Sequence, residues 1–333
     1  MRRLFFLVVL AALVAAGAIA FALLAPAGPE TATYVDILPG TPSAQIAGQL
    51  KQQGIIRSKW VFLGLRLARG GTLKAGEYRF DHPVPMTEVW EKIRRGEVYT
   101  VEVTIPEGSN IFDIGARVQA AGLGTKDAFV AAAKEDASLV QDLDPHAPSL
   151  EGYLFPDTYR FSLHTDPQEM MMAMVKRFRA AAAGIGLTGD LHQTVTLASL
   201  VEKETPIDAE RPLVASVFEN RLAKNMPLMT DPSVIYAALL DGRYRGTIYQ
   251  SDLQADSSYN TYRHQGLPPG PICNPGLKSL EAAMHPAVTD YLYFVAASAD
   301  PSGKSRFSAT IEEHAKDVQA YRRAVRQAGQ PQP

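Results

Sequence analysis

The sequence predicts an α+β protein that begins with a single long apolar helix. An uncharged run from Leu4 to Ala25 follows two arginines at the N-terminus. Strand–turn–helix patterns then recur between residues 35 and 178, and beyond about residue 190 helical periodicity is interrupted by one long loop. We therefore expect a membrane anchor, α+β modules, and a larger domain of helices and loops.

The composition excludes several classes of protein. The chain has 333 residues, enough for two or more domains, and its 33 basic and 35 acidic residues leave a net charge of −2. Without a concentrated basic surface, nucleic acid is not an expected partner. One cysteine, Cys273, and seven scattered histidines provide no zinc-binding pattern, and the common nucleotide-binding and hydrolase motifs are missing. We expect neither a metal nor an organic cofactor.

The apolar run is long enough to cross a bilayer, which takes about 20 residues. Arg2 and Arg3 precede it and no basic cluster follows directly, so its N-terminal end is expected in the cytoplasm. A cleaved signal peptide is the alternative, because AIA at 18–20 and APA at 25–27 resemble cleavage sites. Since the apolar part of a signal peptide has about 7–15 residues, the length favours an uncleaved anchor.

Two pairs of segments resemble each other within the chain. ILPGTPSAQIAGQLKQQGII (37–56) aligns with TIPEGSNIFDIGARVQAAGL (104–123), and YRFDHPVPMTEVWEKIRRG (78–96) aligns with YRFSLHTDPQEMMMAMVKR (159–177). Such internal similarity is typical of duplicated structural units, although coincidence between two strand–helix units is the alternative. The predicted parts are a cytoplasmic end (1–3), the anchor (4–25), a linker (26–34), two α+β modules (35–98 and 99–178), a larger domain of helices and loops (179–326) and a disordered tail (327–333).

Four segments of the last predicted domain have the pattern of helices, and a long loop separates two of them. The helical segments are LHQTVTLASLVEKE (191–204), PLVASVFENRLAKN (212–225), PSVIYAALLDG (232–242) and LKSLEAAMHP (277–286). The loop, 251–276, is rich in Tyr, Asn, Pro and Gly. Because long loops without periodicity are uncommon in compact domains unless they are functional or disordered, we expect this one to contribute to a binding site.

Carboxylates are the remaining candidates for chemistry. Glu202 and Glu204 lie in the last helical turn before Pro206 and point about 160° apart on a helix, so they cannot line one pocket side by side. The alternative is that both are ordinary surface carboxylates, one of them paired with Lys203 or Arg211.

Six motifs, in this order along the chain, resemble those of the endolytic murein transglycosylases, the YceG-like family. They are LEGYLFPDTY (150–159), LASLVEKET (197–205), VASVFENRL (214–222), LMTDPSVIYA (228–237), YNTYRHQGLPPGPICNPG (259–276) and AAMHPAVTDYLYFVA (282–296). The resemblance implies a single-pass enzyme of the inner membrane with its catalytic region in the periplasm. It also implies that the membrane-proximal modules are similar to LysM glycan-binding modules, and that Glu202 is the catalytic acid/base.

The implied reaction requires one carboxyl group. That group protonates the oxygen of the MurNAc–GlcNAc bond and then accepts a proton from the C6 hydroxyl of the same N-acetylmuramic acid, which attacks C1 and leaves a 1,6-anhydro end. Glycosidases that use water need two opposed carboxyl groups instead. Burial beside apolar side chains raises the pKa of a glutamate and favours the acid form.

The motifs also indicate residues for substrate binding. Tyr259, Asn260 and Tyr262 offer rings, phenols and an amide that suit N-acetylated sugars. We expect Glu204 to support the site. Three further residues have alternative roles. Glu151 and Asp157 each either line the cleft or cap a local turn, and Asp231 either lines the cleft or acts as the N-cap of the helix that contains Pro232.

The expected substrate is uncrosslinked or nascent peptidoglycan, cut within the strand so that elongation ends, and glycan-polymerising synthases are the protein partners that the resemblance implies. One alternative is a water-using muramidase with Glu202 as the acid and Glu204, Asp231 or Asp256 as the base. The other is a membrane-tethered scaffold that binds glycan without cleaving it.

Overall fold

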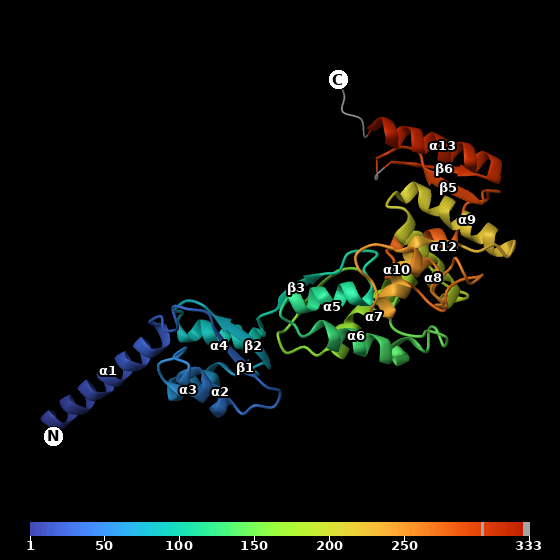
Figure 1. Cartoon of the computed structure of the whole chain (residues 1–333). Coiled ribbons are helices and arrows are strands. Elements are labelled where there is room, and N and C mark those ends of the chain that lie inside the picture. Colours follow the sequence, from blue (N-terminus) through green and yellow to red (C-terminus); the bar gives the residue numbers. More distant parts are fainter. Residues whose placement is uncertain (301–302, 329–333) are drawn as a thin grey trace. The chain divides into compact units, whose positions relative to one another are not determined.

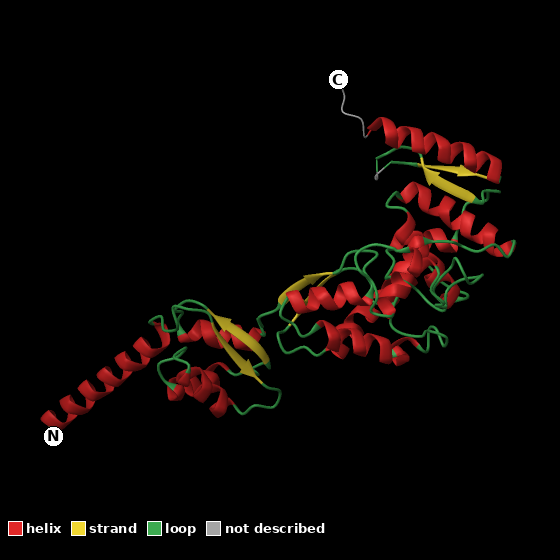
Figure 2. Cartoon of the chain, viewed as in Figure 1, coloured by secondary structure: helices red, strands yellow, loops and turns green. Residues whose placement is uncertain are grey.

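The computed structural model describes residues 1–300 and 303–328, which form two compact units (Figure 1). The first unit contains residues 1–101 and 160–164, and the second contains residues 102–159 together with those that follow residue 164. Helices and short two-stranded sheets are mixed along the chain (Figure 2), which confirms the predicted α+β class.

The first unit begins with the predicted apolar helix, α1 (Arg2–Leu24). Its mean hydropathy is 2.8, and among the described residues it is the one helix with both the length and the composition to span a membrane. Its side chains are exposed along most of its length, but near its C-terminal end Ala22 is buried and Leu23 packs against the core of the unit. The helix is therefore joined to the folded unit at that end.

The rest of the first unit is a β–α–α–β–α arrangement. Its elements are β1 (Thr33–Ile37), α2 (Ser43–Gln52), α3 (Lys59–Arg69), β2 (Gly76–Phe80) and α4 (Met86–Arg95). The two strands are antiparallel, with Val35 opposite Tyr78, and both of these side chains are buried. Apolar side chains of all three helices pack with them, Phe62 of α3 and Trp90 of α4 included, so the unit has a core of its own.

The second unit starts with the same order of elements. These are β3 (Val101–Thr104), α5 (Ile111–Ala120), α6 (Lys126–Glu135), the 3-10 helix η1 (Ala137–Val140), β4 (Thr158–Phe161) and α7 (Pro167–Gly184), although the first residue of β3 and the last two of β4 are grouped with the first unit. Two glycine pairs of the repeated segments, which match when the second copy is shifted by 68 residues, have the same left-handed conformation, with φ of 80° at Gly40 and 73° at Gly108, and 74° at Gly54 and 73° at Gly122. Only glycine adopts this region without strain, so the local chain path recurs as well as the pattern.

The remaining elements of the second unit surround one buried helix, α8. They are α8 (Leu191–Glu204), η2 (Asp208–Glu210), α9 (Arg211–Ala223), α10 (Asp231–Leu240), α11 (Gln250–Leu253), α12 (Leu277–Met284), β5 (Tyr293–Ala296), β6 (Ser305–Ser308) and α13 (Ile311–Ala328). Helices α9, α10 and α12 contact α8, while α13 covers the β5–β6 hairpin, whose strand β5 contacts α9. All four helices predicted after residue 190 are present, whereas the hairpin and α13 were not predicted.

The predicted boundaries relate to these units as follows. The second predicted module, 99–178, belongs almost entirely to the same compact unit as the predicted catalytic domain, 179–326. Of the predicted disordered tail, residues 327 and 328 end α13, and residues 329–333 lie outside the described part of the chain.

Cys273 is fully buried and its Sγ donates to the carbonyl of Ser199 at 3.3 Å, which fits a small packed side chain.

Candidate functional site

Helix α8 carries both glutamates at its C-terminal end. Asp190 caps its N-terminus by accepting from the backbone N–H of Gln193 at 3.0 Å, and every residue from Val195 to Val201 is buried. Glu204 is the last helical residue, because Thr205 adopts an extended conformation with φ of −142° and ψ of 131°. The rigid, buried helix thus holds two carboxyl groups where the chain leaves the core.

Glu202 is engaged in a buried ion pair. Its Oε2 accepts from Nη1 of Arg211 at 2.7 Å and from the backbone N–H of Gly276 at 3.0 Å. The side chains of Glu202 and Arg211 are each 6% exposed. A Cβ at Gly276 would lie 2.0 Å from the carboxylate of Glu107, so the chain fits tightly there. The Glu202 carboxylate therefore connects α8 to α9 through Arg211 and to the start of α12 through Gly276.

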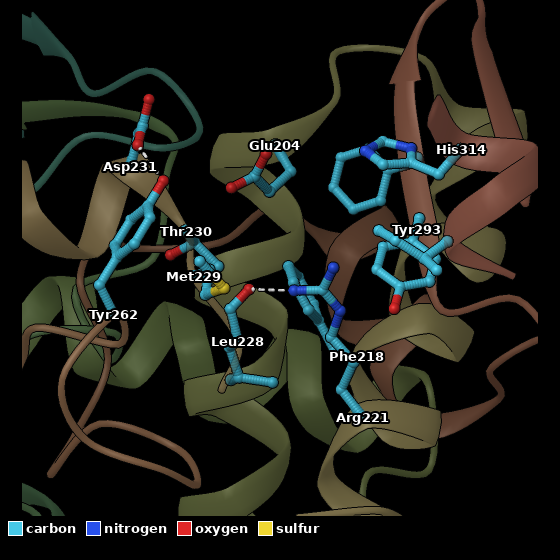
Figure 3. Close-up of a pocket in the computed structure, with 12 residues that line it drawn as sticks. Glu204, Phe218, Arg221, Leu228, Met229, Thr230, Asp231, Tyr262, Tyr293 and His314 are labelled. Atoms are coloured by element: carbon cyan, nitrogen blue, oxygen red, sulfur yellow. Dashed lines mark hydrogen bonds between the residues drawn. The ribbon is translucent and has the colours of Figure 1, made fainter. Parts of the chain in front are cut away.

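Glu204 lies on the other side of α8 and lines a cavity of about 460 Å³. Figure 3 shows its carboxyl group pointing into the space between the Asp231–Tyr262 pair and the Tyr293–His314 pair. Within the described part of the chain, no hydrogen-bond donor engages this carboxyl group. Cavities of about 300–1,000 Å³ are typical of ligand sites, so the space suits part of a sugar chain.

The surroundings of Glu204 favour its protonated form. Burial raises its pKa from 4.5 to about 7, and the negative charge of Asp231 raises it further, against a lowering effect of Arg221. Burial penalises the charged form because the carboxylate loses solvation that no hydrogen bond replaces. Glu204 can therefore hold a proton and release it near neutral pH.

Tyr262 and Asp231 form the wall of the cavity beside Glu204. The hydroxyl of Tyr262 donates to Oδ1 of Asp231 at 2.6 Å, shown as a dashed line in Figure 3. Asp231 is not the N-cap of its helix: Thr230 occupies that position, and Asp231 and Pro232 are the first two helical residues. The sequence-based alternative of a capping role is therefore wrong, and its carboxylate is free to face the cavity.

Arg221 stabilises the wall of the cavity that includes Tyr293. Its Nε donates to the carbonyl of Leu292 at 2.7 Å and its Nη1 to that of Leu228 at 2.9 Å, and the guanidinium lies 5.3 Å from the centre of the Tyr293 ring. Burial lowers the pKa of Arg221, against the charges of Tyr293 and Glu204. One side chain thus ties α9 to the segment before α10 and to the hairpin.

Two polar atoms at the cavity are buried without a hydrogen-bond partner among the described residues, Oγ1 of Thr230 and Nδ1 of His314. The backbone at Thr230 is held by Thr261, whose Oγ1 accepts from its N–H at 2.9 Å. The preceding Met229 has φ of 54°, a left-handed conformation that is uncommon for a residue with a side chain. Buried polar atoms usually have partners, so these two are suited to meet a ligand.

The other sequence-predicted binding residues lie in packed parts of the fold. Nδ2 of Asn260, which is fully buried, donates to the carbonyls of Leu253 and Ala255 at 3.0 and 2.9 Å, so its amide holds the loop after α11. The Tyr259 ring packs 5.2 Å from that of Tyr236.

Glu151 is also buried within the fold. It accepts from the backbone N–H of Ile111 at 2.9 Å and from Nδ2 of Asn274 at 2.8 Å. Asp157 accepts from Nε of Arg177 at 2.6 Å. Of the predicted set, the structure therefore brings together Glu204, Asp231 and Tyr262, and it places Glu202, Tyr259, Asn260 and Glu151 elsewhere.

Sequence reasoning missed Arg221, Thr230, Tyr293 and His314. The first three lie inside motifs that carried the family resemblance, so their motif positions were an available signal. His314 lies on α13, beyond all six motifs, and its ring stacks on Tyr293 at 5.1 Å. Nothing in the sequence near His314 separates it from the other scattered histidines.

Comparison with known proteins places the chain in a family. The model of the YceG-like family matches residues 35–320. The protein named endolytic murein transglycosylase from Bacillus subtilis (strain 168) is 34% identical over 314 residues, which are 88% of this chain and 85% of that protein. The chain belongs to the YceG-like family.

Further relatives agree with this assignment. The endolytic murein transglycosylase of Streptococcus pneumoniae (strain D39) is 30% identical over 85% of this chain, and the alignment spans 57% of that longer protein. The crystal structure of a yceG-like protein from Listeria monocytogenes, 32% identical, matches with a TM-score of 0.55 over 86% of this chain and 99% of that one.

Proposed function

We propose that the chain is an endolytic murein transglycosylase, the activity for which its curated relatives are named. The observation that carries the proposal is a half-buried carboxyl group, Glu204, whose pKa is raised to about 7 at a cavity of sugar size. The proposed substrate is the glycan strand of uncrosslinked or nascent peptidoglycan, cut at a MurNAc–GlcNAc bond within the strand.

In the proposed mechanism, Glu204 acts as both acid and base. Protonated Glu204 donates to the bridging oxygen as the bond to C1 breaks, and the resulting carboxylate accepts the proton of the C6 hydroxyl. The C6 oxygen then bonds to C1 of the same sugar, which gives a 1,6-anhydro end and returns the proton to Glu204. A pKa near the working pH serves both proton transfers.

This assignment moves the catalytic role from Glu202, which the resemblance implied, to Glu204. Glu202 is enclosed by Arg211 and Gly276 and is not among the residues that line the cavity, whereas Glu204 points into it. A general acid must come within hydrogen-bond reach of the glycosidic oxygen, about 2.6–3.2 Å. That requirement supports Glu204 and leaves Glu202 a structural role.

The neighbours of Glu204 have supporting roles in the proposal. The charge of Asp231 favours the protonated state of Glu204 and also stabilises the positive charge that develops at C1. Tyr262 holds that carboxylate in place through its hydroxyl. Oγ1 of Thr230 and Nδ1 of His314, which have no partner among the described residues, form hydrogen bonds with hydroxyl or N-acetyl groups of the glycan in this proposal.

A water-using muramidase is the second candidate, because a second carboxylate, Asp231, stands beside Glu204. In that reaction Asp231 would activate water while Glu204 protonates the leaving oxygen. The hydroxyl of Tyr262 already occupies one oxygen of Asp231, which leaves that carboxylate less available to bind and activate water and so favours the single-carboxyl reaction. Asp256, the remaining sequence-based candidate, is 83% exposed, pairs with His264 and does not line the cavity.

Mass spectrometry of the glycan ends tests the proposal. Full-length protein is incubated with purified peptidoglycan, and the muropeptides released by a later complete digestion are weighed. We expect new ends of 1,6-anhydro-N-acetylmuramic acid, lighter by one water than reducing ends. Reducing ends would instead support the muramidase, and uncut strands that remain bound to the protein would support a non-catalytic scaffold.

The proposed location is the inner membrane, with α1 as a single-pass anchor, its N-terminus in the cytoplasm, and the second unit and the rest of the first unit outside. At about 1.5 Å per residue the 23 residues of α1 extend about 34 Å, against a hydrocarbon core of about 30 Å. The division into LysM-like modules and the synthase partners belong to the same proposal, and they rest on the sequence resemblance.

A further inference from the structure

Helix α3, in the first unit, carries an apolar stripe that does not face the core. Trp60 and Leu67 are 72% and 88% exposed, and Gly64 between them is exposed as well. These residues follow an i, i+4, i+7 spacing, which places them on one side of a helix. Phe62 and Leu65 occupy the side that packs against the core. The helix is therefore apolar on two sides, and only one of them is covered.

The same region of the chain is strongly basic. Residues 37–76 contain six lysines and arginines and no aspartate or glutamate. Three of the basic residues, Lys59, Arg66 and Arg69, lie on α3 itself. A helix with basic residues and an exposed Trp/Leu stripe has the composition of helices that lie in the plane of a membrane surface.

The fold places α3 at the end of the proposed anchor. Nη1 of Arg57 donates to the carbonyl of Ala25, the residue after α1, at 2.8 Å, and its guanidinium lies 4.8 Å from the centre of the Phe21 ring. Helices α1 and α3 contact each other within this unit. The first turn of α3 therefore begins beside the point where α1 would leave the hydrocarbon.

The distances fit the headgroup layer of a bilayer. Each interfacial layer is about 5–8 Å thick, if the total thickness is about 40–45 Å and the hydrocarbon about 30 Å. Trp60 follows Arg57 by three residues, so the chain can separate them by at most about 10 Å. Tryptophan is enriched at this depth, and lysine and arginine extend toward the phosphates from it.

We infer that α3 is an interfacial helix, which lies on the outer surface of the membrane with Trp60 and Leu67 inserted among the lipids and its basic residues against anionic headgroups. This inference rests on the proposed role of α1 as an anchor. Its consequence is that the first unit is held against the bilayer by two elements, so its orientation relative to the membrane is restricted.

Fluorescence quenching by brominated phospholipids tests this inference on the full-length protein in liposomes that contain an anionic lipid. The chain has two tryptophans, and Trp90 is only 3% exposed in the core of the unit. The difference between the wild type and Trp60→Phe therefore isolates the emission of Trp60. We expect bromine near the headgroup end of the acyl chains to remove most of that emission and to leave the Trp90 emission largely unchanged.

A negative charge placed on the apolar stripe provides the second measurement. Leu67→Glu should restore most of the quenched Trp60 emission, whereas Leu38→Glu, at a 64% exposed leucine outside α3, should leave the quenching unchanged. An unaltered Trp90 spectrum shows that each variant is folded. Equal quenching in the wild type and Leu67→Glu would contradict the inference.

Flotation of the same liposomes separates this inference from the anchor. Protein that floats with the lipid while Trp60 emission is not quenched would overturn the interfacial helix and leave the anchor intact. Protein that does not float would overturn both. Trp60 emission that shifts with added glycan strands, and not with brominated lipid, would assign this face of α3 to glycan and also overturn the inference.

Discussion

A carboxyl group that first donates and then accepts a proton needs a pKa near the pH at which it works. Glu204 meets this requirement through burial and through the charge of Asp231, which both raise its pKa. Glu202, two residues earlier, forms a buried ion pair with Arg211 and does not line the cavity. At the scale of single residues, the site depends on which side of α8 each glutamate faces.

Removal of the charge of Asp231 should change the pH dependence of cleavage. Asp231→Asn abolishes a negative charge that raises the pKa of Glu204, so that pKa falls. Because cleavage starts from protonated Glu204, the loss of activity with rising pH should move to lower pH. The rate of strand cleavage, measured between about pH 5 and pH 9, tests this prediction. In the wild type the activity should fall around the Glu204 pKa of about 7, and in Asp231→Asn it should fall at a lower pH.

Asp256→Asn is the matched control for this profile. Its carboxylate is 83% exposed and pairs with His264, away from the residues that line the cavity, so the profile should not move. An alkaline limb at the same pH in Asp231→Asn and the wild type would mean that Asp231 does not act on the titrating group.

The sequence predicted part of this residue-level arrangement. A rotation of 100° per residue separated Glu202 from Glu204 as the structure does, and Tyr262 of the predicted polar loop lines the cavity beside Glu204. The choice between the two glutamates depends on the elements that pack on each side of α8, which helical periodicity does not specify. The resemblance pointed to Glu202, and the surroundings of the two side chains favour Glu204.

At the scale of elements, the wall of the cavity that carries Tyr293 and His314 comes from the β5–β6 hairpin and α13. Each strand of the hairpin has only four residues, and isolated hairpins are at best marginally stable in water. Their stability comes from α9 on one side and α13 on the other. The YFVA segment is nevertheless rich in aromatic and β-branched residues, which favour strands, so its composition was an available signal that the sequence-based prediction left out.

Glu151 connects elements that are distant in sequence, and its removal should destabilise the second unit. It accepts from the N–H of Ile111 at the start of α5 and from Asn274 before α12. Glu151→Ala leaves both donors buried without a partner, at about 1–3 kcal/mol each. We expect a loss of about 3 kcal/mol or more in the free energy of unfolding, measured by chemical denaturation.

Glu135→Ala serves as the control, since this glutamate is exposed at the end of α6 and should change stability by less than about 0.5 kcal/mol. Folded Glu151→Ala protein should also retain normal affinity for glycan strands. Unchanged stability together with weakened glycan binding would give Glu151 the substrate-binding role that its motif suggested.

At the scale of the whole molecule, the recurrence in the sequence predicted two strand–helix units in each copy, but neither the additional helix between them (α3 and α6) nor how the copies associate. The first copy has its own core, whereas the second belongs to the compact unit that contains α8. Long-range bonds explain the difference: the carbonyl of Asn274 accepts from Gly108 at 2.9 Å, and its side chain binds Glu151. Sequence similarity between two segments therefore predicts that their backbones have similar local conformations, but it does not predict which other elements they pack against.

Deletion of residues 35–98 should therefore leave the second unit folded. We expect the deleted protein to keep one cooperative unfolding transition, to bind glycan strands less strongly, and to lose proportionally less of its cleavage rate per bound strand. Some rate loss is expected, because remote binding energy also orients the reacting bond. Sedimentation with insoluble peptidoglycan measures binding, and an unfolded product would show that the two units form one core.

The most direct test of the account compares Glu204→Gln with Glu202→Gln in the full-length protein. Gln keeps the size of the side chain and removes the transferable proton, so Glu204→Gln should slow formation of 1,6-anhydro ends by about 10²–10⁴-fold with its melting temperature retained. Glu202→Gln should chiefly lower stability, because it breaks a buried ion pair, while its folded fraction still cleaves. A stable, inactive Glu202→Gln beside an active Glu204→Gln would contradict the account.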